Sequence, residues 1–227
     1  MAVDRSIVNE ELGGGYTDRS QGVSLIWSPT DQFTAEIMYH DGANQDNTNF
    51  ADDAPNYGVA GRAEYIVFGD GKAYSDFTAM GNKADLLVFG GGADYSPTGD
   101  SYVLAYTFDG QFETTNGTSV YVAYLGLQSD EGGAGSTHDW GGLVQVAQMV
   151  SSKAEVFGRY GYIDLDESDN SVHEITVGVN YYFYGHNVKG TLDLVYLPEG
   201  TDSDSGLGYV SSDDSQVVLR AQFQLLI

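Results

Sequence analysis

Residues 172–196 read VHEITVGVNYYFYGHNVKGTLDLVY, and this stretch decides the fold. Apolar and polar side chains alternate on both sides of the central Gly185-His186-Asn187. A period of two places alternate side chains on opposite faces of a strand, so the stretch predicts a β-hairpin with one apolar and one polar face. Each arm is about ten residues long, a length that a tilted transmembrane strand requires and that soluble sheets rarely sustain repeatedly.

The same alternation continues along most of the chain. A weak first strand, or a partly helical segment, is expected at residues 5–11. With this segment and the two strands of the hairpin, the pattern predicts about twelve strands. The other nine are residues 22–28, 33–41, 57–68, 86–95, 102–113, 120–127, 140–150, 154–165 and 217–227. Nothing in the composition suggests a second domain, so residues 1–227 are expected to form a single β-barrel domain.

The connections between the predicted strands differ in length at the two ends. If the turn at Pro29 marks one end of a barrel, five connections lie at the other end, and three of the five are long. Outer-membrane barrels combine short periplasmic turns with longer external loops in this way. The five connections are residues 42–56, 97–100, 128–139, 166–171 and 197–214.

Composition excludes several classes of protein. The chain has 227 residues with no Cys, so neither disulfides nor thiolate metal sites exist. No run approaches 18 apolar residues, so no membrane-spanning helix is predicted. The formal charge of −24 argues against a nucleic-acid partner, whose phosphates require basic side chains. The first residues lack a basic region followed by an apolar one, so an exported chain would be a mature form or a fragment.

The apolar faces admit two interpretations. In a soluble sandwich they would meet in a shared core, and in a membrane barrel they would contact lipid. Long strands, charges of both signs in mid-strand, and aromatic residues near strand ends favour an all-β transmembrane, antiparallel, up-and-down β-barrel. The alternative is a soluble acidic β-sandwich or jelly roll that binds carbohydrate or calcium. The aromatic residues in question are Trp27, Tyr39, Tyr57, Tyr102, Tyr181 and Tyr196.

Under the barrel interpretation the polar faces line the pore. Acidic residues outnumber basic ones on these faces, and rings of charge set ion selectivity, so the predicted channel favours cations. The predicted pore-lining residues are Glu36, Arg62, Glu64, Asp109, Glu113, Glu155, Arg159, Glu174, Asn180, Lys189, Asp193 and Arg220.

Signals for catalysis are weak, and the chain is predicted not to be an enzyme. No HExxH or GxSxG motif occurs, and a His40–Glu36 acid–base pair is a less economical interpretation than a histidine that simply faces the lumen. Gly90-Gly91-Gly92 has no following Lys and is expected to permit close packing. Acidic loops at residues 164–169 and 202–214 could take Ca²⁺, but no EF-hand spacing occurs, so no metal or cofactor is predicted.

Several stretches resemble phosphate-selective porins of the O/P family, in particular a planctomycete-like branch. They are residues 2–25, Asp76-Phe77-Thr78, LLVFGGGADY at 86–95, residues 173–196 and QVVLRAQFQLLI at 216–227. The resemblance implies an outer-membrane β-barrel, commonly a homotrimer, whose partners are outer-membrane lipid and small hydrophilic solutes or ions.

Two departures from that family limit what the resemblance implies. Family members have about sixteen strands, so the resemblance implies that the first several are missing here. Family anion selectivity rests on lumen Arg and Lys, whereas this chain has nine basic residues in all. The expected function is therefore a porin without phosphate selectivity, a passive water-filled outer-membrane channel for small solutes or ions that leans toward cations.

Overall fold

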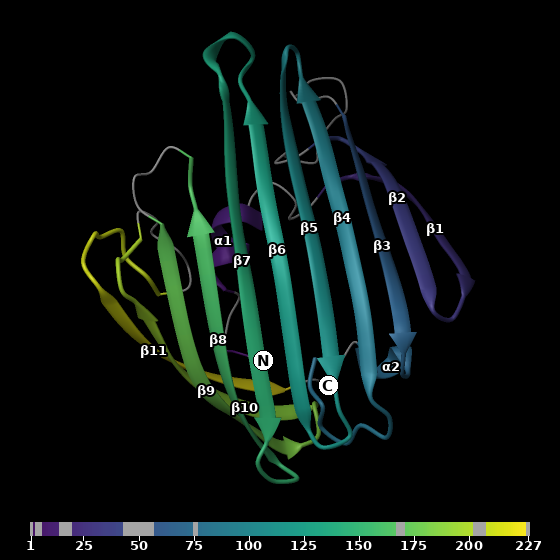
Figure 1. The fold of residues 1–227 in the computed structure, drawn as a ribbon, viewed down its shortest axis with the longest axis vertical. Helices are drawn as coiled ribbons and strands as arrows, with labels where there is room; N and C mark the ends of the chain where they lie inside the picture. The colour runs from purple at the N-terminus through teal and green to yellow at the C-terminus, as the bar shows by residue number, and fades with distance from the viewer. Residues whose placement is uncertain are drawn as a thin grey trace.

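The computed structural model describes residues 2, 6–13, 20–42, 57–74, 77–166, 171–201 and 208–225. Eleven strands form one antiparallel sheet, and their order across the sheet is their order along the chain (Figure 1). The strands are β1 (Gly22–Thr30), β2 (Phe33–His40), β3 (Gly58–Phe68), β4 (Leu86–Thr98), β5 (Ser101–Glu113), β6 (Thr118–Asp130), β7 (Ser136–Met149), β8 (Ala154–Asp164), β9 (Val172–Tyr184), β10 (Val188–Leu197) and β11 (Gln216–Leu225). The prediction of an all-β, up-and-down, antiparallel architecture is confirmed.

The predicted count of about twelve strands is wrong, because the expected first strand is a helix. Ile7–Gly13 forms α1, in agreement with the partly helical alternative. Ile7 and Val8 are both fully buried although they are neighbours, and a strand would place them on opposite faces. A helix brings Ile7, Val8 and Leu12 to one side, where all three pack against the sheet.

The remaining helices are short and lie in connections between strands. Gly71–Tyr74 forms α2 between β3 and β4, and Gly132–Ala134 forms the 3₁₀ helix η1 between β6 and β7. No helix in the described ranges is long and apolar enough to cross a membrane.

The two faces of the sheet differ in character. The inner face, defined here as the face against which α1 packs, carries the charged and polar side chains of the β9–β10 hairpin, including the fully buried Glu174 and Asn180. The outer face carries Ile175, Val177 and Val179, and the side chain of Val177 is 53% exposed. The predicted alternation in this hairpin is therefore confirmed, with the apolar face outermost.

The apolar core lies on the inner face, between α1 and the second half of the sheet. Because α1 contacts β6, β7 and β8, it covers the middle of the inner face (Figure 1). The buried residues of this core are Ile7, Val8, Leu12, Leu143, Ile163, Val172, Val195, Leu197 and Tyr209.

The sheet has two free edges. β1 pairs with β2 and β11 pairs with β10, and the described residues contain no pairing between β1 and β11. Neighbouring strands are all antiparallel, so two odd-numbered strands such as β1 and β11 run in the same direction. A closed barrel is thus not formed by the described residues.

Asn116-Gly117 lies in the turn that joins β5 to β6. Gly117 has a φ of 83°, which glycine adopts without the steric cost that a β-carbon would impose. Much of the predicted long loop at 42–56 and part of the loop at 197–214 lie outside the described residues, as do Asp76 and Ile227.

Candidate functional site on the inner face

The strand register places all twelve predicted pore-lining residues on the inner face of the sheet. Eight are buried, three are partly buried, and Glu36 near the β1 edge is exposed. The partly buried three are Arg62, Glu64 and Asp109. That these residues line a water-filled pore stays a prediction. The eight buried residues are Glu113, Glu155, Arg159, Glu174, Asn180, Lys189, Asp193 and Arg220.

Glu174 on β9 is the centre of the most extensive network on this face. Its Oε1 accepts hydrogen bonds from Arg159 Nε at 2.7 Å and Thr176 Oγ1 at 3.0 Å. Its Oε2 accepts from the backbone N–H of Ile7 at 2.8 Å and from the Tyr209 hydroxyl at 3.1 Å. One buried carboxylate therefore ties β8, the start of α1 and the segment before β11 together.

The environment of Tyr209 reflects its place in this network. Burial, followed by the negative charge of Glu174, raises the pKa of Tyr209 above its ordinary value of 10.0. The phenol therefore stays protonated and donates to the carboxylate. Neither Tyr209 nor Thr176 is among the predicted pore-lining residues. Thr176 shares the polar face of β9 with Glu174, which is a signal in the sequence, whereas Tyr209 lies in a connection and gives none.

A second buried ion pair joins β10 to β11. Arg220 donates from Nε to Asp193 Oδ1 at 2.8 Å and from Nη2 to Oδ2 at 3.1 Å. This two-pronged geometry fixes the guanidinium in one orientation. Arg220 Nη1 is buried and has no hydrogen-bond partner among the described residues.

Glu155 on β8 binds the connection between α2 and β4 to the inner face through a hydrogen bond. Its Oε1 accepts a hydrogen bond from Thr78 Oγ1 at 2.8 Å. Its Oε2 accepts from Asn180 Nδ2 at 2.7 Å and from the Tyr182 hydroxyl at 2.8 Å. A segment distant in the sequence is thus held inside the curve of the sheet by a carboxylate that is itself fully buried.

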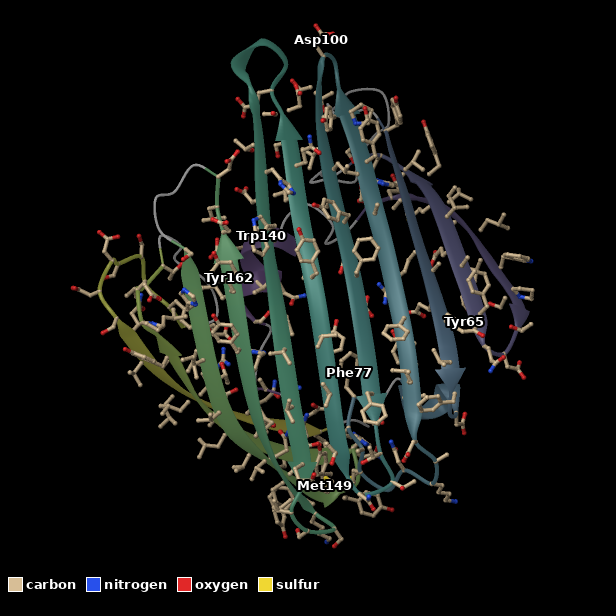
Figure 2. The ribbon with its side chains drawn as sticks, in the orientation of Figure 1. Tyr65, Phe77, Asp100, Trp140, Met149 and Tyr162 are labelled. Atoms are coloured by element: carbon tan, nitrogen blue, oxygen red, sulfur yellow. The ribbon has the colours of Figure 1, made fainter. Side chains whose placement is uncertain are left out.

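Phe77 and Asn82 anchor the same connection at two further points. The Phe77 ring, which is labelled in Figure 2, makes a T-shaped contact with Tyr121 of β6, with 5.0 Å between ring centroids. Asn82 donates from Nδ2 to Glu113 Oε2. Phe77 adopts a φ of 53°, which non-glycine residues rarely do. Phe77 is an aromatic residue within a polar connection, which is a sequence signal for this inward fold.

Arg62 on β3 forms a partly exposed charged group near the other side of the sheet. It donates from Nη1 and Nη2 to the two carboxylate oxygens of Asp109, at 2.8 and 3.0 Å. Its Nε donates to Glu64 Oε1 at 3.0 Å, an oxygen that also accepts from the Tyr74 hydroxyl at 2.8 Å. Burial, then the hydrogen bond to Glu64, raises the pKa of Tyr74 from 10.0 to about 12.

Charged side chains of the neighbouring strands lie close over Gly90, in the run of glycines of β4. A β-carbon on Gly90 would collide with the guanidinium of Arg62 and lie 2.9 Å from the carboxylate of Asp109. The expectation that these glycines permit close packing is confirmed, because the Arg62–Asp109 pair crosses directly over position 90.

His40 is a further ionisable side chain on this side of the sheet. The backbone N–H of Gly42 donates to its Nδ1 at 3.1 Å, so the neutral ring carries its proton on Nε2. Nε2 lies 3.2 Å from Asp94 Oδ2, a close approach whose angle is poor for a hydrogen bond. The hypothesis of a His40–Glu36 pair is wrong, since four residues along a strand separate these groups by about 13 Å.

A cavity of about 720 Å³ opens between these two charged groups. Its floor is formed by small side chains on four neighbouring strands, Ala60, Gly92, Ala105 and Ala123. Its charged lining consists of His40, Arg62, Asp94 and Asp109, and α1 contributes Asn9, Leu12 and Gly13 as one wall. Asp94 was not predicted, although it shares the face of Gly90 and Gly92.

The described residues contain no group of three or more His, Cys, Asp or Glu side chains placed to hold a metal ion. The acidic loop residues Asp202 and Asp204, considered above for Ca²⁺, lie outside the described ranges.

Comparisons with known proteins give no relative to which this site could be matched. No protein-family model, no curated protein and no solved structure matches the chain. The function is therefore inferred from the geometry of the chain alone.

Proposed function

We propose that the protein is a passive channel of the bacterial outer membrane. In this proposal the eleven-stranded sheet is the wall of a transmembrane β-barrel around a narrow water-filled pore, which passes small hydrophilic solutes or ions and prefers cations. The observation that carries the proposal is the division of one sheet into an exposed apolar face and a charged face that encloses a cavity.

The outer face supports contact with lipid. Soluble monomers rarely expose a contiguous apolar patch larger than about 300–600 Å². Here the apolar side chains of successive strands are exposed from one edge of the sheet to the other, and Trp27 on β1 is 59% exposed. A soluble sandwich would cover such a face with a second sheet, and all strands in the described ranges belong to one sheet. Further members of the face are Val23, Leu25, Ile37, Val59, Phe89, Phe108, Val122, Val144, Val156, Leu192, Leu194, Leu219 and Phe223.

An aromatic belt supports a membrane–water interface at one level of this face. Five rings, one from each of β5 to β9, follow one another at centroid distances of 6.1, 6.0, 5.4 and 5.1 Å. Tyr and Trp are enriched at the interfaces of membrane barrels because their rings are apolar and their tips are polar. Figure 2 labels two neighbouring members, Trp140 and Tyr162. The rings are those of Tyr106, Tyr124, Trp140, Tyr162 and His173.

The charges in the cavity support a preference for cations. Among the described residues, Arg62 is the only Lys or Arg that lines the cavity, and its charge is balanced by ion pairs to Asp109 and Glu64. Asp94 adds a further carboxylate to the lining. The resulting negative surplus would lower the barrier for cations relative to anions.

The proposal requires the two free edges of the sheet to be joined. Unpaired backbone groups of β1 and β11 in lipid would cost several kcal/mol each. Because the chain has no Cys, pairs of introduced cysteines report on this contact without background. We expect a cysteine at Leu25 to form a disulfide with a cysteine at one of Leu219, Ala221 and Phe223 in membranes. The absence of any such crosslink would mean that another strand closes the barrel.

The resemblance to O/P-family porins is consistent with this proposal and adds outer-membrane localisation to it. Phosphate selectivity is not part of the proposal, because the inner face lacks the surplus of Arg and Lys that it would need. Association into homotrimers is common in that family, and for this chain only the resemblance supports it.

Planar-bilayer recording tests the function directly. We expect discrete conductance steps, with potassium more permeant than chloride in a salt gradient. The purified protein should require detergent and show a heat-dependent shift on gels. A monodisperse protein without detergent and without conductance would instead support the soluble acidic β-sandwich or jelly roll that binds carbohydrate or calcium.

A further inference from the structure

Two elements occupy the concave side of the sheet, namely α1 and the connection between β3 and β4. We call the described part of that connection, residues 69–74 and 77–85, the inward connection. Its helix α2 lies at the same end of the sheet as the short β5–β6 and β7–β8 turns (Figure 1). Outer-membrane barrels place short turns on the periplasmic side, so this is the periplasmic end of the proposed channel.

The helix α2 closes the 720 Å³ cavity at this end. Toward the short turns, the last inner-face residues that line the cavity are Arg62 on β3 and Asp109 on β5. Tyr74 binds the next inner-face residue on each of these two strands. Its hydroxyl donates to Glu64 Oε1 at 2.8 Å, and its carbonyl oxygen accepts from Gln111 Nε2 at 3.1 Å. Tyr74 thus crosses β4 directly beyond the cavity.

The rest of the inward connection extends this closure across the sheet. Phe77 contacts Tyr121, which is the cavity-lining residue of β6 nearest to the short turns. Thr78 donates from Oγ1 to Glu155 of β8 at 2.8 Å, and its Oγ1 accepts from the Tyr182 hydroxyl of β9 at 3.3 Å. The inward connection therefore spans the inner face from β3 to β9.

The two ends of the inward connection touch each other. A β-carbon on Gly69 would lie 2.6 Å from the backbone oxygen of Asp85 and 2.8 Å from Leu86 Cα. Loops whose ends are close form compact units and are frequently functional. Phe77 has a φ of 53°, and backbone strain of this kind clusters at switch regions. The inward connection is thus a strained loop attached to the sheet at a narrow neck.

The two elements inside the curve of the sheet are held by different forces. Val8 and Leu12 of α1 pack onto glycines of the sheet. A β-carbon on Gly141 would lie 3.0 Å from Leu12, and one on Gly161 would lie 3.2 Å from Val8. The inward connection is held by hydrogen bonds of its polar groups, and among its described residues only Ala79 is a buried apolar side chain. Segments with few buried apolar contacts open at a lower free energy than packed ones, so the inward connection is the element that can move.

We propose that the inward connection is a gate at the periplasmic end of the channel, held shut by hydrogen bonds of Tyr74, Thr78 and Asn82. The inference rests on the proposed function, because a gate requires a pore. Opening at the neck joins the cavity to the periplasm. Glu113 and Glu155, which accept hydrogen bonds from the closed gate, then face the pore and extend its negative lining.

Two substitutions together loosen the gate and leave the sheet intact. Thr78→Val keeps the shape of the side chain and removes its hydrogen bond to Glu155, and Asn82→Ala removes the hydrogen bond to Glu113. Each carboxylate keeps another donor on the sheet. Because two hydrogen bonds are lost, we expect the open population to rise about tenfold or more in this double variant.

Two measurements on the full chain follow the opening. The chain has no Cys, so Ala79→Cys introduces a single buried thiol that a water-soluble maleimide reaches only when the gate opens. We expect labelling in detergent to be about tenfold faster in the double variant than with Ala79→Cys alone. Planar-bilayer recording of the double variant should show a parallel rise in open probability.

Thr176→Val is the matched control. It removes a threonine hydrogen bond to a different buried carboxylate, Glu174, but from a strand and not from the gate. Labelling of Ala79→Cys and open probability should both stay within about twofold of the native values in this control. An effect as large as that of the double variant would overturn the gate, because any buried hydrogen bond would then have the same influence.

A reversible crosslink tests the gate in the opposite direction. Asn82→Cys and Glu113→Cys place one thiol on the gate and one on β5, in side chains that are in contact in the native protein. A short bis-methanethiosulfonate should lower the open probability, and dithiothreitol should restore it. A crosslinked protein that conducts like the reduced one would overturn the gate.

The outcomes separate the gate from the channel. Faster labelling with a higher open probability would support the gate, even if only the double variant conducts. Native protein and double variant that conduct equally would overturn the gate and leave the channel standing. A higher open probability without faster labelling would also overturn the gate, because the inward connection would not have moved. The absence of conductance in both proteins would overturn the channel and the gate with it.

Discussion

The inner faces of β7–β11 and of β2–β5 are built from the same alternating pattern but pack in opposite ways. Over β7–β11, α1 and large apolar side chains fill the concave side, and the charged residues Glu174 and Asp193 are fully enclosed with their arginines. Over β2–β5 several inner positions hold Ala or Gly, among them Ala60, Gly92 and Ala105, and a cavity remains there beside a partly exposed Arg62. The polar pattern of a strand therefore does not determine whether its polar face is exposed to water.

The difference has a consequence for charge. Buried ion pairs lose their hydration and are costly to break, whereas pairs in contact with water are worth little. We call the inner face of β7–β11 the packed half and that of β2–β5 the hollow half. Stability should depend on the charges of the packed half, and solute passage on those of the hollow half.

The largest effect is expected for Glu174→Ala in the packed half. The substitution leaves Arg159 buried without its carboxylate and removes the acceptor of the Ile7 N–H, so we expect a loss of about 3–5 kcal/mol in the free energy of unfolding. Denaturant unfolding in detergent micelles would measure it. Glu64→Ala is the matched control, since Arg62 keeps Asp109 and the site is in contact with water, and its loss should be below about 1 kcal/mol. Equal losses would abolish the distinction between the halves.

A pair of apolar substitutions should separate stability from conductance. Leu143→Ala opens a void beneath α1, and we expect a loss of about 2–5 kcal/mol in the free energy of unfolding. Ala60→Leu adds volume to the cavity floor, where space exists, and should change stability by less than about 1 kcal/mol. Single-channel conductance should fall in Ala60→Leu and stay near the native value in folded Leu143→Ala. The reverse pattern of conductance would place the solute path in the packed half.

Replacing a whole buried ion pair should cost less than breaking it. We expect Arg220→Met alone to lose about 3–5 kcal/mol, because the charge of Asp193 stays buried and loses the guanidinium that balances it. The combination of Arg220→Met with Asp193→Leu should recover most of that loss, as an apolar pair of similar volume packs in the same place. A double-mutant cycle by denaturant unfolding measures this coupling, and additive losses would mean that water reaches the pair.

The smallest effect is the pH dependence that arises from Tyr74. Its pKa is raised from 10.0 to about 12, so the folded state holds the phenol proton more tightly than the unfolded state. The resulting stability is fully present below pH 10 and is lost as the pH rises from 10 to about 12. Tyr74→Phe should lose stability less steeply over this range, as followed by denaturant unfolding at several pH values. Exposed Tyr184→Phe serves as control and should follow the native curve.

The strands and their faces follow from local patterns in the sequence. A period of two in hydrophobicity is a local property, so each of the eleven strands from β1 to β11 could be located, and the register places all twelve predicted pore-lining residues on one face. Residues 5–11 are the exception, because a seven-residue helix with adjacent Ile7 and Val8 gives too few periods to distinguish it from a strand.

The contacts of each polar residue, by contrast, depend on how distant parts of the chain meet in three dimensions. The partners of Glu174 include Ile7 and Tyr209, which are separated from it by 167 and 35 residues, and no local pattern encodes such contacts. For the same reason the carboxylate beside His40 is that of Asp94 and not that of Glu36. Pairing between strands brings residues together across the sheet, whereas residues several positions apart along one strand stay far apart. The division into a packed and a hollow half follows from where α1 lies, because the same alternating face is dry beneath a helix and open where the side chains are small.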